Sequence, residues 1–178
     1  RNSIAVGNDG KPILVYSAAS DLLLAKCQNL NCSAYATSTL VASNSTAMNV
    51  YGDWQNQGVF IHSSGTVNFV ATTTGHTIVA SSSPFGSVLF NSSAGGWTIP
   101  NNATTASALT LTSLTALTVS PGATLEVGGT FTNSVGGSAT TWTNSTLYLN
   151  SGTSYTVNAT TTGADSYATL EIGASTNV

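Results

Sequence analysis

The sequence predicts an all-β protein in which a short antiparallel meander precedes a parallel β-helix. Three observations lead to this fold class. First, 25 Ser, 29 Thr, 16 Asn and 17 Gly make up about half of the 178 residues, a composition that suits short strands and turns. Second, short segments of alternating apolar and polar residues recur from Val59 onward, as in strands with one buried face. Third, parts of this region echo one another.

Residues 1–41 are predicted to form the meander. Ser3–Gly7 alternates like a strand, and Pro12–Ser17 and Leu22–Cys27 are further short apolar strands. Asn8–Lys11 separates the first two, and its Asn-Asp-Gly sequence tolerates the positive φ angles of a tight turn. The short spacing between the segments indicates that neighbouring strands are antiparallel.

This region also resembles a repeat found in very large bacterial surface proteins. The resemblance is carried by VGNDGKPILVYSAASDLLLAKCQNLNCS, in which the matching residues are Asp9, Gly10, Pro12, Tyr16, Leu24, Ala25, Cys27, Asn29 and Cys32. It implies one blade of a β-propeller. Because one unit cannot close a propeller, we expect either a last blade or a hairpin packed on its neighbour.

Cys27 and Cys32 flank the polar sequence Gln-Asn-Leu-Asn. In a chain this rich in hydroxyl residues, we expect them to form a disulfide across the end of a hairpin, as in proteins of oxidising compartments. Two free thiols in a cytosolic protein are the alternative. Zinc is disfavoured because two cysteines without paired histidines nearby are an incomplete ligand set.

Residues 42–58 are interpreted as a connection, because they lack strong alternation. They contain Trp54, which is either a packed plug of the core or an exposed platform for a sugar. Trp97 and Trp142 raise the same two alternatives. An exposed row of these rings would indicate a module that contacts surface glycans.

Residues 59–178 are predicted to form the β-helix. Their strands place apolar residues two apart, in the pairs Val67 and Phe69, Val88 and Phe90, Leu109 and Leu111, Leu125 and Val127, Leu147 and Leu149, Tyr155 and Val157, and Leu170 and Ile172. A solenoid stacks such strands around one core, and roughly 20–25 residues per turn give about five or six turns. An Ig-like β-sandwich, with about seven strands at 8–12-residue spacing, is the alternative fold.

Internal echoes indicate a degenerate repeat. The sequence ATLEVGG at Ala123 returns as ATLEIGA at Ala168, 45 residues later. ATTTG at Ala71 returns at Ala159, 88 residues later. The two intervals are close to one and two units of about 44 residues, but they are out of phase with each other.

The same region resembles repeats of bacterial surface proteins. The resemblance is carried by TTTGHTIVASSSPFGSVLFNSSAGGWTI, SLTALTVSPGATLEVGGTFTN and TLYLNSGTSYTVNATTTGADSYATLEIG, which together span most of residues 69–178. It implies a right-handed parallel β-helix and an adhesin-like protein.

The scarcity of charge excludes several function classes. Three basic and six acidic residues give a net charge of −3, so the chain offers no basic stripe for nucleic acid or for an anionic membrane surface. No apolar run approaches the roughly 18 residues of a spanning helix, so we expect no membrane insertion. The chain opens at Arg1 without Met and stops at Val178 directly after an expected strand. We therefore expect both ends to be cut or processed from something longer.

Groups that could carry catalysis are few. His62 follows a strand and His76 follows a turn, and both are expected at the surface. Glu126 and Glu171 occupy the same place in the echoed ATLE motif, so stacked turns would put them on one outer face, where a polysaccharide-active β-helix enzyme would hold paired acids. Such an enzyme usually also needs Lys or Arg, and none follows Lys26. We predict no enzymatic activity, no cofactor and no metal site.

Six N-x-S/T sequons are available for glycosylation if a glycosylating cell secretes the chain. They begin at Asn31, Asn44, Asn91, Asn102, Asn144 and Asn158. A chain this rich in Ser and Thr contains about this many by chance, so their number indicates nothing by itself.

Together these features predict an extracellular or cell-surface structural protein, a subunit or segment of a fibre or adhesin shaft. Few like charges oppose close contact between chains, and an uncapped solenoid end offers free strand edges. The expected partner is either another copy, in head-to-tail filaments, or the neighbouring repeats of one longer chain. The alternative functions are a module that binds surface glycans and, third, a polysaccharide-active β-helix enzyme.

Overall fold

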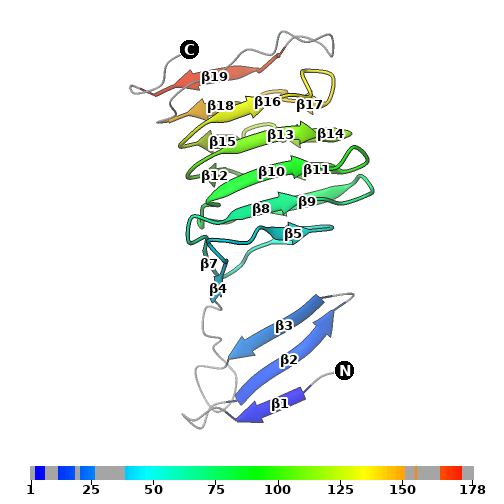
Figure 1. The fold of residues 1–178 in the computed structure, drawn as a ribbon, viewed down its shortest axis with the longest axis vertical. Coiled ribbons are helices and arrows are strands. Elements are labelled where there is room, and N and C mark those ends of the chain that lie inside the picture. Colours follow the sequence, from blue (N-terminus) through cyan, green and yellow to red (C-terminus); the bar gives the residue numbers. More distant parts are fainter. Residues whose placement is uncertain are drawn as a thin grey trace. The chain divides into compact units, whose positions relative to one another are not determined.

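The computed structural model divides the chain into two compact units, Arg1–Leu40 and Val41–Val178. The described residues are 39–150, 155 and 165–173, together with the backbone of 3–6, 12–18 and 21–26. Their secondary structure is entirely β (Figure 1), which confirms the predicted class. This part of the chain has no helix long and apolar enough to span a membrane.

The first unit holds one antiparallel sheet. Its strands, in their order across the sheet, are β1 (Ser3–Val6), β2 (Pro12–Ala18) and β3 (Asp21–Lys26). The central strand β2 pairs antiparallel with both neighbours, so the predicted meander is confirmed at the level of its strands. The expected turn at Asn8–Lys11, and both Cys27 and Cys32, lie outside the described residues.

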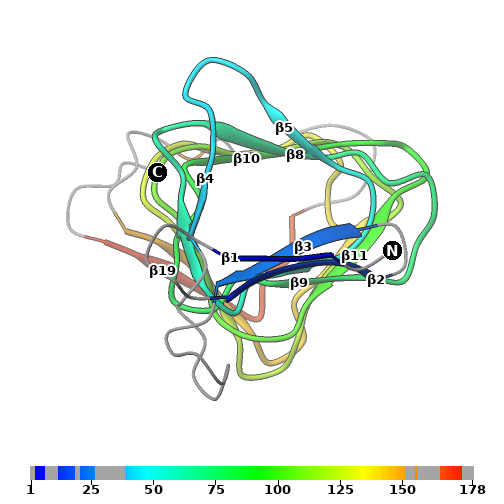
Figure 2. The ribbon, with the colours of Figure 1, turned by 90° about the horizontal axis from the view of Figure 1, so that it is seen from below.

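The second unit is a parallel β-helix of about six turns, whose coil is seen end-on in Figure 2. The first sheet contains β5 (Met48–Val50), β8 (Thr66–Phe69), β10 (Ser87–Asn91), β13 (Leu109–Ser113) and β16 (Phe131–Asn133). The second contains β6 (Trp54–Gln55), β9 (His76–Val79), β11 (Gly96–Ile99), β14 (Ala116–Val119) and β17 (Thr140–Thr141). The third contains β12 (Ala103–Thr105), β15 (Thr124–Val127), β18 (Thr146–Leu149) and β19 (Thr169–Ile172). A two-stranded sheet joins β4 (Thr39–Val41) and β7 (Val59–Ile61).

Parallel pairing sets the length of each turn. In the first sheet Val88 pairs with Leu109 of the next turn. In the third sheet Leu125 pairs with Leu147, and Leu147 pairs with Leu170. Each partner follows within roughly 20–25 residues, so the predicted turn length is confirmed, and the echo between the two ATLE motifs spans two turns. Because the three large sheets are parallel, this unit is not an Ig-like sandwich, whose sheets are antiparallel.

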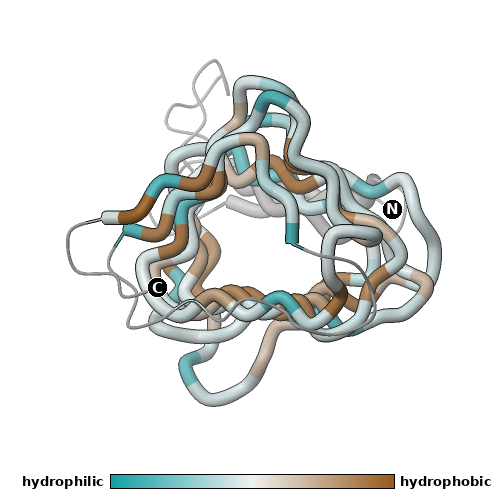
Figure 3. Tube along the Cα trace, turned by 90° about the horizontal axis from the view of Figure 1, so that it is seen from above, coloured by the Kyte–Doolittle hydropathy of each residue, from teal (hydrophilic) through white to brown (hydrophobic). Residues whose placement is uncertain are grey.

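Every second residue of the strands points into the core. Strands β8, β14, β15 and β18 alternate between partly buried and fully buried positions, as period-two alternation requires. Figure 3 shows the hydrophobic segments recurring along the coil from turn to turn. The largest fully buried side chains are Trp97, Phe69, Phe90, Phe131, Ile78, Leu109, Leu111, Leu117, Leu147, Leu149, Val67 and Val119. One continuous apolar core thus runs through the described turns.

Aromatic rings form two groups, one in the first three turns and one in the last turns, around Phe131 and Tyr167. Trp54 lies 5.3 Å from Phe85 between ring centroids. Phe69 stacks on Phe90 at 5.0 Å, and Phe90 meets Trp97 edge to face at 5.2 Å. Such pairs stabilise a core beyond the area that they bury. Aliphatic side chains fill the corresponding positions of the next turn, at Leu109, Leu111, Leu117, Val119, Leu125 and Val127.

Gly95 is required by the close approach of two turns. A Cβ atom at this position would lie 2.7 Å from the carbonyl oxygen of Ala71 in the preceding turn. It would also collide with the indole ring of Trp97. Because glycine has no side chain, the Trp97 ring can lie against the backbone at this corner and remain buried.

Residues 42–58 differ from the expected connection. Both β5 and β6 lie within them and pair in parallel with the next turn, where Met48 is opposite Val67 and Trp54 is opposite Ile78. These residues therefore form the first two sides of the first turn of the β-helix, which β7 completes. Alternation did not reveal it, because strands of three and two residues are too short to show a period of two.

Replacing Leu147 by Ala should lower the free energy of unfolding by about 2–5 kcal/mol, because the side chain is fully buried and the surrounding turns cannot close the cavity completely. Thr146→Ala is the matched control. It is the preceding residue of the same strand and points outward, so its effect should stay within about 0.5 kcal/mol. Urea denaturation followed by circular dichroism measures both. Equal losses for the two variants would contradict the inward orientation of Leu147.

Candidate functional site

The three tryptophans lie in the core. Trp54 is the most exposed of them, at 9%, and Trp97 and Trp142 are more deeply buried. The indole nitrogen Nε1 of Trp97 donates a hydrogen bond to the carbonyl oxygen of Gly52 at 3.3 Å. All three rings pack against other aromatic side chains. The structure thus places them as core plugs, whereas contact with a surface glycan requires exposed rings.

His76 joins two neighbouring turns through polar contacts. Its Nε2 lies 3.0 Å from Thr73 Oγ1, and its Nδ1 lies 3.8 Å from Asp53 Oδ1. The same Asp53 oxygen accepts hydrogen bonds from the backbone N–H of Thr77 at 2.7 Å and from its hydroxyl at 3.2 Å. Sequence reasoning missed this contact. The only signal for it is that His76 follows Asp53 at a distance along the chain that equals one turn of the β-helix.

A hydroxyl, an imidazole and a carboxylate in this order also occur in hydrolytic triads. Here the carboxylate of Asp53 is exposed, and its 3.8 Å distance from the imidazole is longer than a hydrogen bond. Its short contact is instead with the backbone of Thr77 in β9. We interpret the group as a clamp that holds the loop at Asp53 against the second turn.

His62 is a turn residue. Its Nδ1 accepts a hydrogen bond from the backbone N–H of Ser64 at 2.9 Å. Ser63 and Ser64 have φ angles of 47° and 61°, so this side-chain contact supports a left-handed turn. A Cβ atom on Gly86 would lie 2.9 Å from the same ring nitrogen, which shows that the imidazole packs against the next turn.

Glu126 and Glu171 share one outward column of the third sheet, as their positions in the ATLE motif predict. Tyr148 lies between them in register, so their backbones are two strands apart, or about 9–10 Å. Glu126 accepts hydrogen bonds from Asn150 Nδ2 at 2.5 Å and from Thr104 Oγ1 at 3.5 Å. The carboxylate of Glu126 is therefore engaged by the neighbouring turns, and Tyr148 separates the two acids.

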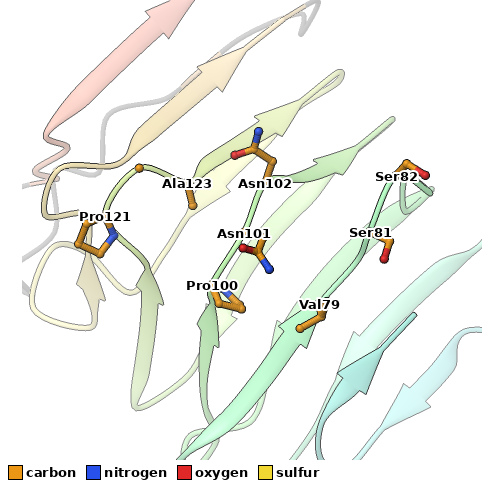
Figure 4. Close-up of a pocket in the computed structure, with 9 residues that line it drawn as sticks. Val79, Ser81, Ser82, Pro100, Asn101, Asn102, Pro121 and Ala123 are labelled. Atoms are coloured by element: carbon orange, nitrogen blue, oxygen red, sulfur yellow. The ribbon is translucent and has the colours of Figure 1, made fainter. Parts of the chain in front are cut away.

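A shallow hollow of about 600 Å³ lies at the corner between the second and third sheets (Figure 4). It is lined by Val79, Ser81, Ser82, Pro100, Asn101, Asn102, Pro121, Gly122 and Ala123. None of these residues is titratable, and Asn102 Oδ1 already accepts a hydrogen bond from the backbone N–H of Thr124 at 2.9 Å. The hollow therefore supplies no acid, base or nucleophilic pair. Within the described residues, no group of three or more His, Cys, Asp and Glu side chains could hold a metal ion.

A polar cluster lies at the C-terminal turns. Asp165 accepts hydrogen bonds from Asn133 Nδ2 at 2.9 Å and from the Tyr155 hydroxyl at 2.6 Å. The hydroxyls of Tyr155 and Tyr167 are 3.0 Å apart. Asn133 is buried, and its Oδ1 accepts the backbone N–H of Gly136 at 3.0 Å. The cluster ties the chain that follows β18 to β16, and no motif in the sequence pointed to it.

Burial raises the pKa of both tyrosine hydroxyls in this cluster. For Tyr155 the loss of water is the largest cause, and the hydrogen bond to Asp165 adds to it. For Tyr167 the loss of water is again the largest cause. Both side chains therefore stay neutral in the folded protein at a pH where a tyrosine in water ionises.

The C-terminal strand of the third sheet exposes aliphatic side chains. Leu170 and Ile172 in β19 are 38% and 43% exposed. They are in register with Leu147 and Leu149 in β18, which are fully buried. The difference arises because β18 has a strand on each side, whereas β19 is the last strand of its sheet among the residues that the structure describes.

The opposite end of the unit has the same character. Leu40 and Val41 in β4 are exposed, as are Val59 and Ile61 in β7 and, in the loop that follows β5, Tyr51. Isolated apolar residues are common on protein surfaces, but groups of them mark interaction sites. The two ends of the β-helix are therefore the candidate functional site of this chain.

Four of the six sequons lie in the described part of the chain. Asn44, Asn91, Asn102 and Asn144 occupy exposed positions, where a glycosylating enzyme could reach them. The other two begin at Asn31 and Asn158, which lie outside the described residues.

Comparison of the chain with protein families, with curated proteins and with solved structures gives no match. The resemblance of both regions to repeats of bacterial surface proteins therefore stays a prediction. Function rests on the geometry of the two ends and on the composition of the chain.

Stability should fall as the pH rises above about 10. In the unfolded chain Tyr155 and Tyr167 ionise near that pH, whereas burial raises their pKa in the folded chain. The folded state then binds more protons, so a rising pH favours unfolding. Tyr155→Phe and Tyr167→Phe should each reduce the loss of stability at alkaline pH, whereas Tyr51→Phe, at an exposed position, should not. Urea unfolding over a series of pH values measures these slopes, and equal slopes in all variants would contradict the expectation.

Proposed function

We propose that this chain is an extracellular structural protein, a subunit or segment of a fibre or adhesin shaft at a cell surface. The observation that carries the proposal is a β-helix with one continuous core and exposed aliphatic side chains on the strands at both ends. A solenoid that is extended at its ends gains length without changing its width. Such an element suits a protein that spans distance.

The outward side chains support this role. One outward column of the second sheet consists of Thr77, Thr98, Thr118 and Thr141. One column of the third sheet consists of Thr124, Thr146 and Thr169. With 5% charged residues in the whole chain, little electrostatic repulsion opposes close approach of two molecules. The threonine hydroxyls keep the outer surface hydrated, and the low charge lets two copies of the chain approach closely.

The described titratable groups also support a structural role. Asp53 and His76 connect the first two turns, and Glu126 connects its own turn to both neighbours. Asp165 holds the chain that follows β18. Each of these side chains stabilises the stack of turns, and none of them lines the hollow of Figure 4.

Electron microscopy of the purified full chain tests the proposal. Over a series of rising concentrations we expect linear particles that grow end to end, because the exposed strand edges lie at the ends. Sedimentation velocity should show a mass that increases with concentration. Dispersed single particles at every concentration, or compact closed oligomers, would contradict head-to-tail assembly.

A disulfide between Cys27 and Cys32 is expected if the protein matures outside the cytosol. In protein isolated from its native source and denatured, neither cysteine should react with maleimide until a reductant is added. Mass spectrometry of the labelled peptide measures this directly. Two thiols that react without reduction would contradict an extracellular location.

A further inference from the structure

The strands β4 and β19 lie on the same side of the β-helix, one at each end of it. In each turn the chain passes first along the first sheet, then along the second and then along the third. In the first turn β7 follows β5 and β6, so it occupies the position that β12, β15 and β18 occupy in later turns. At one end β4 pairs with β7, and at the other end β19 pairs with β18. Figure 1 shows these strands on one side of the coil. Within the described residues, no strand pairs with the far edge of β4 or β19.

The backbone of β19 directs hydrogen-bonding groups away from the β-helix. The N–H groups of Thr169 and Gly173 donate to carbonyl oxygens of the preceding turn at 3.2 and 2.7 Å. Since peptide groups alternate in direction along a strand, Leu170 and Ile172 direct their N–H and C=O groups to the open edge. These are also the two residues with exposed aliphatic side chains. Among the described residues, this edge therefore has neither a hydrogen-bonding strand nor an apolar cover.

Strand β4, which precedes the first turn of the β-helix, presents the complementary edge. The backbone N–H of Ala42 donates to the carbonyl oxygen of Ile61 at 2.9 Å, so Ala42 directs its peptide groups toward β7. Val41 and Thr39 alternate with it and direct theirs away from β7. The side chain of Val41 is 59% exposed. In β19 the peptide groups at the open edge belong to residues whose side chains point inward. In β4 they belong to residues whose side chains point outward. Two neighbouring strands of one parallel ladder require this combination.

The sequence of β4 matches the strands at the far end of the third sheet. The strands β15, β18 and β19 read TLEV, TLYL and TLEI, and residues 39–42 read TLVA. No other described strand begins Thr-Leu. In β15 and β18 the Thr is outward and the Leu is buried. The strand that β4 contacts within its own chain, β7, has the different sequence VFI.

We propose that β19 of one copy of the chain binds β4 of a second copy as its next parallel strand. This inference rests on the proposed structural function and identifies the two surfaces through which copies join. The N–H of Val41 then donates to the carbonyl oxygen of Leu170, and the N–H of Ile172 donates to that of Val41. The resulting register pairs Thr39 with Thr169, Leu40 with Leu170, Val41 with Glu171 and Ala42 with Ile172.

This pairing covers the inward aliphatic side chains of the two edge strands, Leu170 and Ile172 in β19 and Leu40 in β4. Leu40 continues the inward column of Leu147 and Leu170, and Thr39 continues the outward column of threonines. Glu171 lies beside Val41 on the outer face, so its carboxylate remains in water. The contact joins two different surfaces, so it repeats from copy to copy without closing into a dimer.

Val41→Pro in the full chain tests the pairing. Proline removes an N–H that points away from β7, so the β4–β7 pair can persist, as in edge strands that carry proline. We expect the concentration needed for linear assembly to rise about tenfold, with the thermal unfolding midpoint of the unassembled chain unchanged. Val41→Thr keeps both the N–H and the branched side chain. It is the matched control and should assemble like the original chain.

A charge exchange tests the register without proline. Val41→Glu places a second carboxylate opposite Glu171 across the contact, and like charges in this position repel. We expect the assembly concentration to rise about two- to fivefold at low salt. The double variant V41E/E171K places opposite charges there and should assemble at least as readily as the original chain.

The outcomes separate this inference from the proposed function. If the original chain forms linear assemblies and neither V41P nor V41E weakens them, β19 does not bind β4, and the shaft function stands. If E171K fails to rescue V41E, the register is wrong. If the original chain never forms linear assemblies, both head-to-tail assembly and this contact are overturned.

Discussion

The parallel hydrogen-bond ladder between successive turns is the constraint on which the rest of the β-helix depends. Each strand must place its inward residues directly above those of the strand one turn earlier, so the chain changes length mainly at the corners, with one register shift inside the first sheet between Phe90 and Asn91. The turn that leads from Val88 to its partner Leu109 is shorter than the turn from Phe131 to Tyr155, yet both pairs hold their place in the first sheet. The clamp at Asp53 and the close approach at Gly95 join adjacent turns at or beside these corners.

Alternation along single strands was readable from the sequence, and it led to the correct architecture. Strands such as Thr146–Leu149 carry the pattern within one short segment, and the solenoid interpretation predicted the correct turn length. The first turn was not readable, because β5 and β6 are too short to alternate. The interval between the ATLE motifs suggested a unit of two turns, since the intervening strand TLYL shares only part of the motif.

Contacts between turns were harder to foresee than contacts within strands. Glu126 and Glu171 were placed on one face because an echoed motif marks them both. Asp53 and His76 carry no such mark, and the cluster around Asp165 joins residues that are 10 and 32 positions apart. The Thr-Leu sequence of β4 can be read directly from the chain, but the sequence alone does not identify β4 as an edge strand. A Thr-Leu strand becomes informative only when pairing shows that it lies at an edge.

The pairing of each turn with the next, and the aromatic groups at both ends of the core, have a consequence for how the chain folds. Each strand finds its partner one turn away, so every pairing step closes only a short loop, at a small cost in chain entropy. The turns around Phe69, Phe90 and Trp97 gain aromatic contacts as they pair, as do the turns around Phe131 and Tyr167, and each finished turn is a template for the next. Folding should therefore start at an aromatic group, during synthesis at the one that is made first, and advance one turn at a time, an order that pulsed hydrogen exchange can observe.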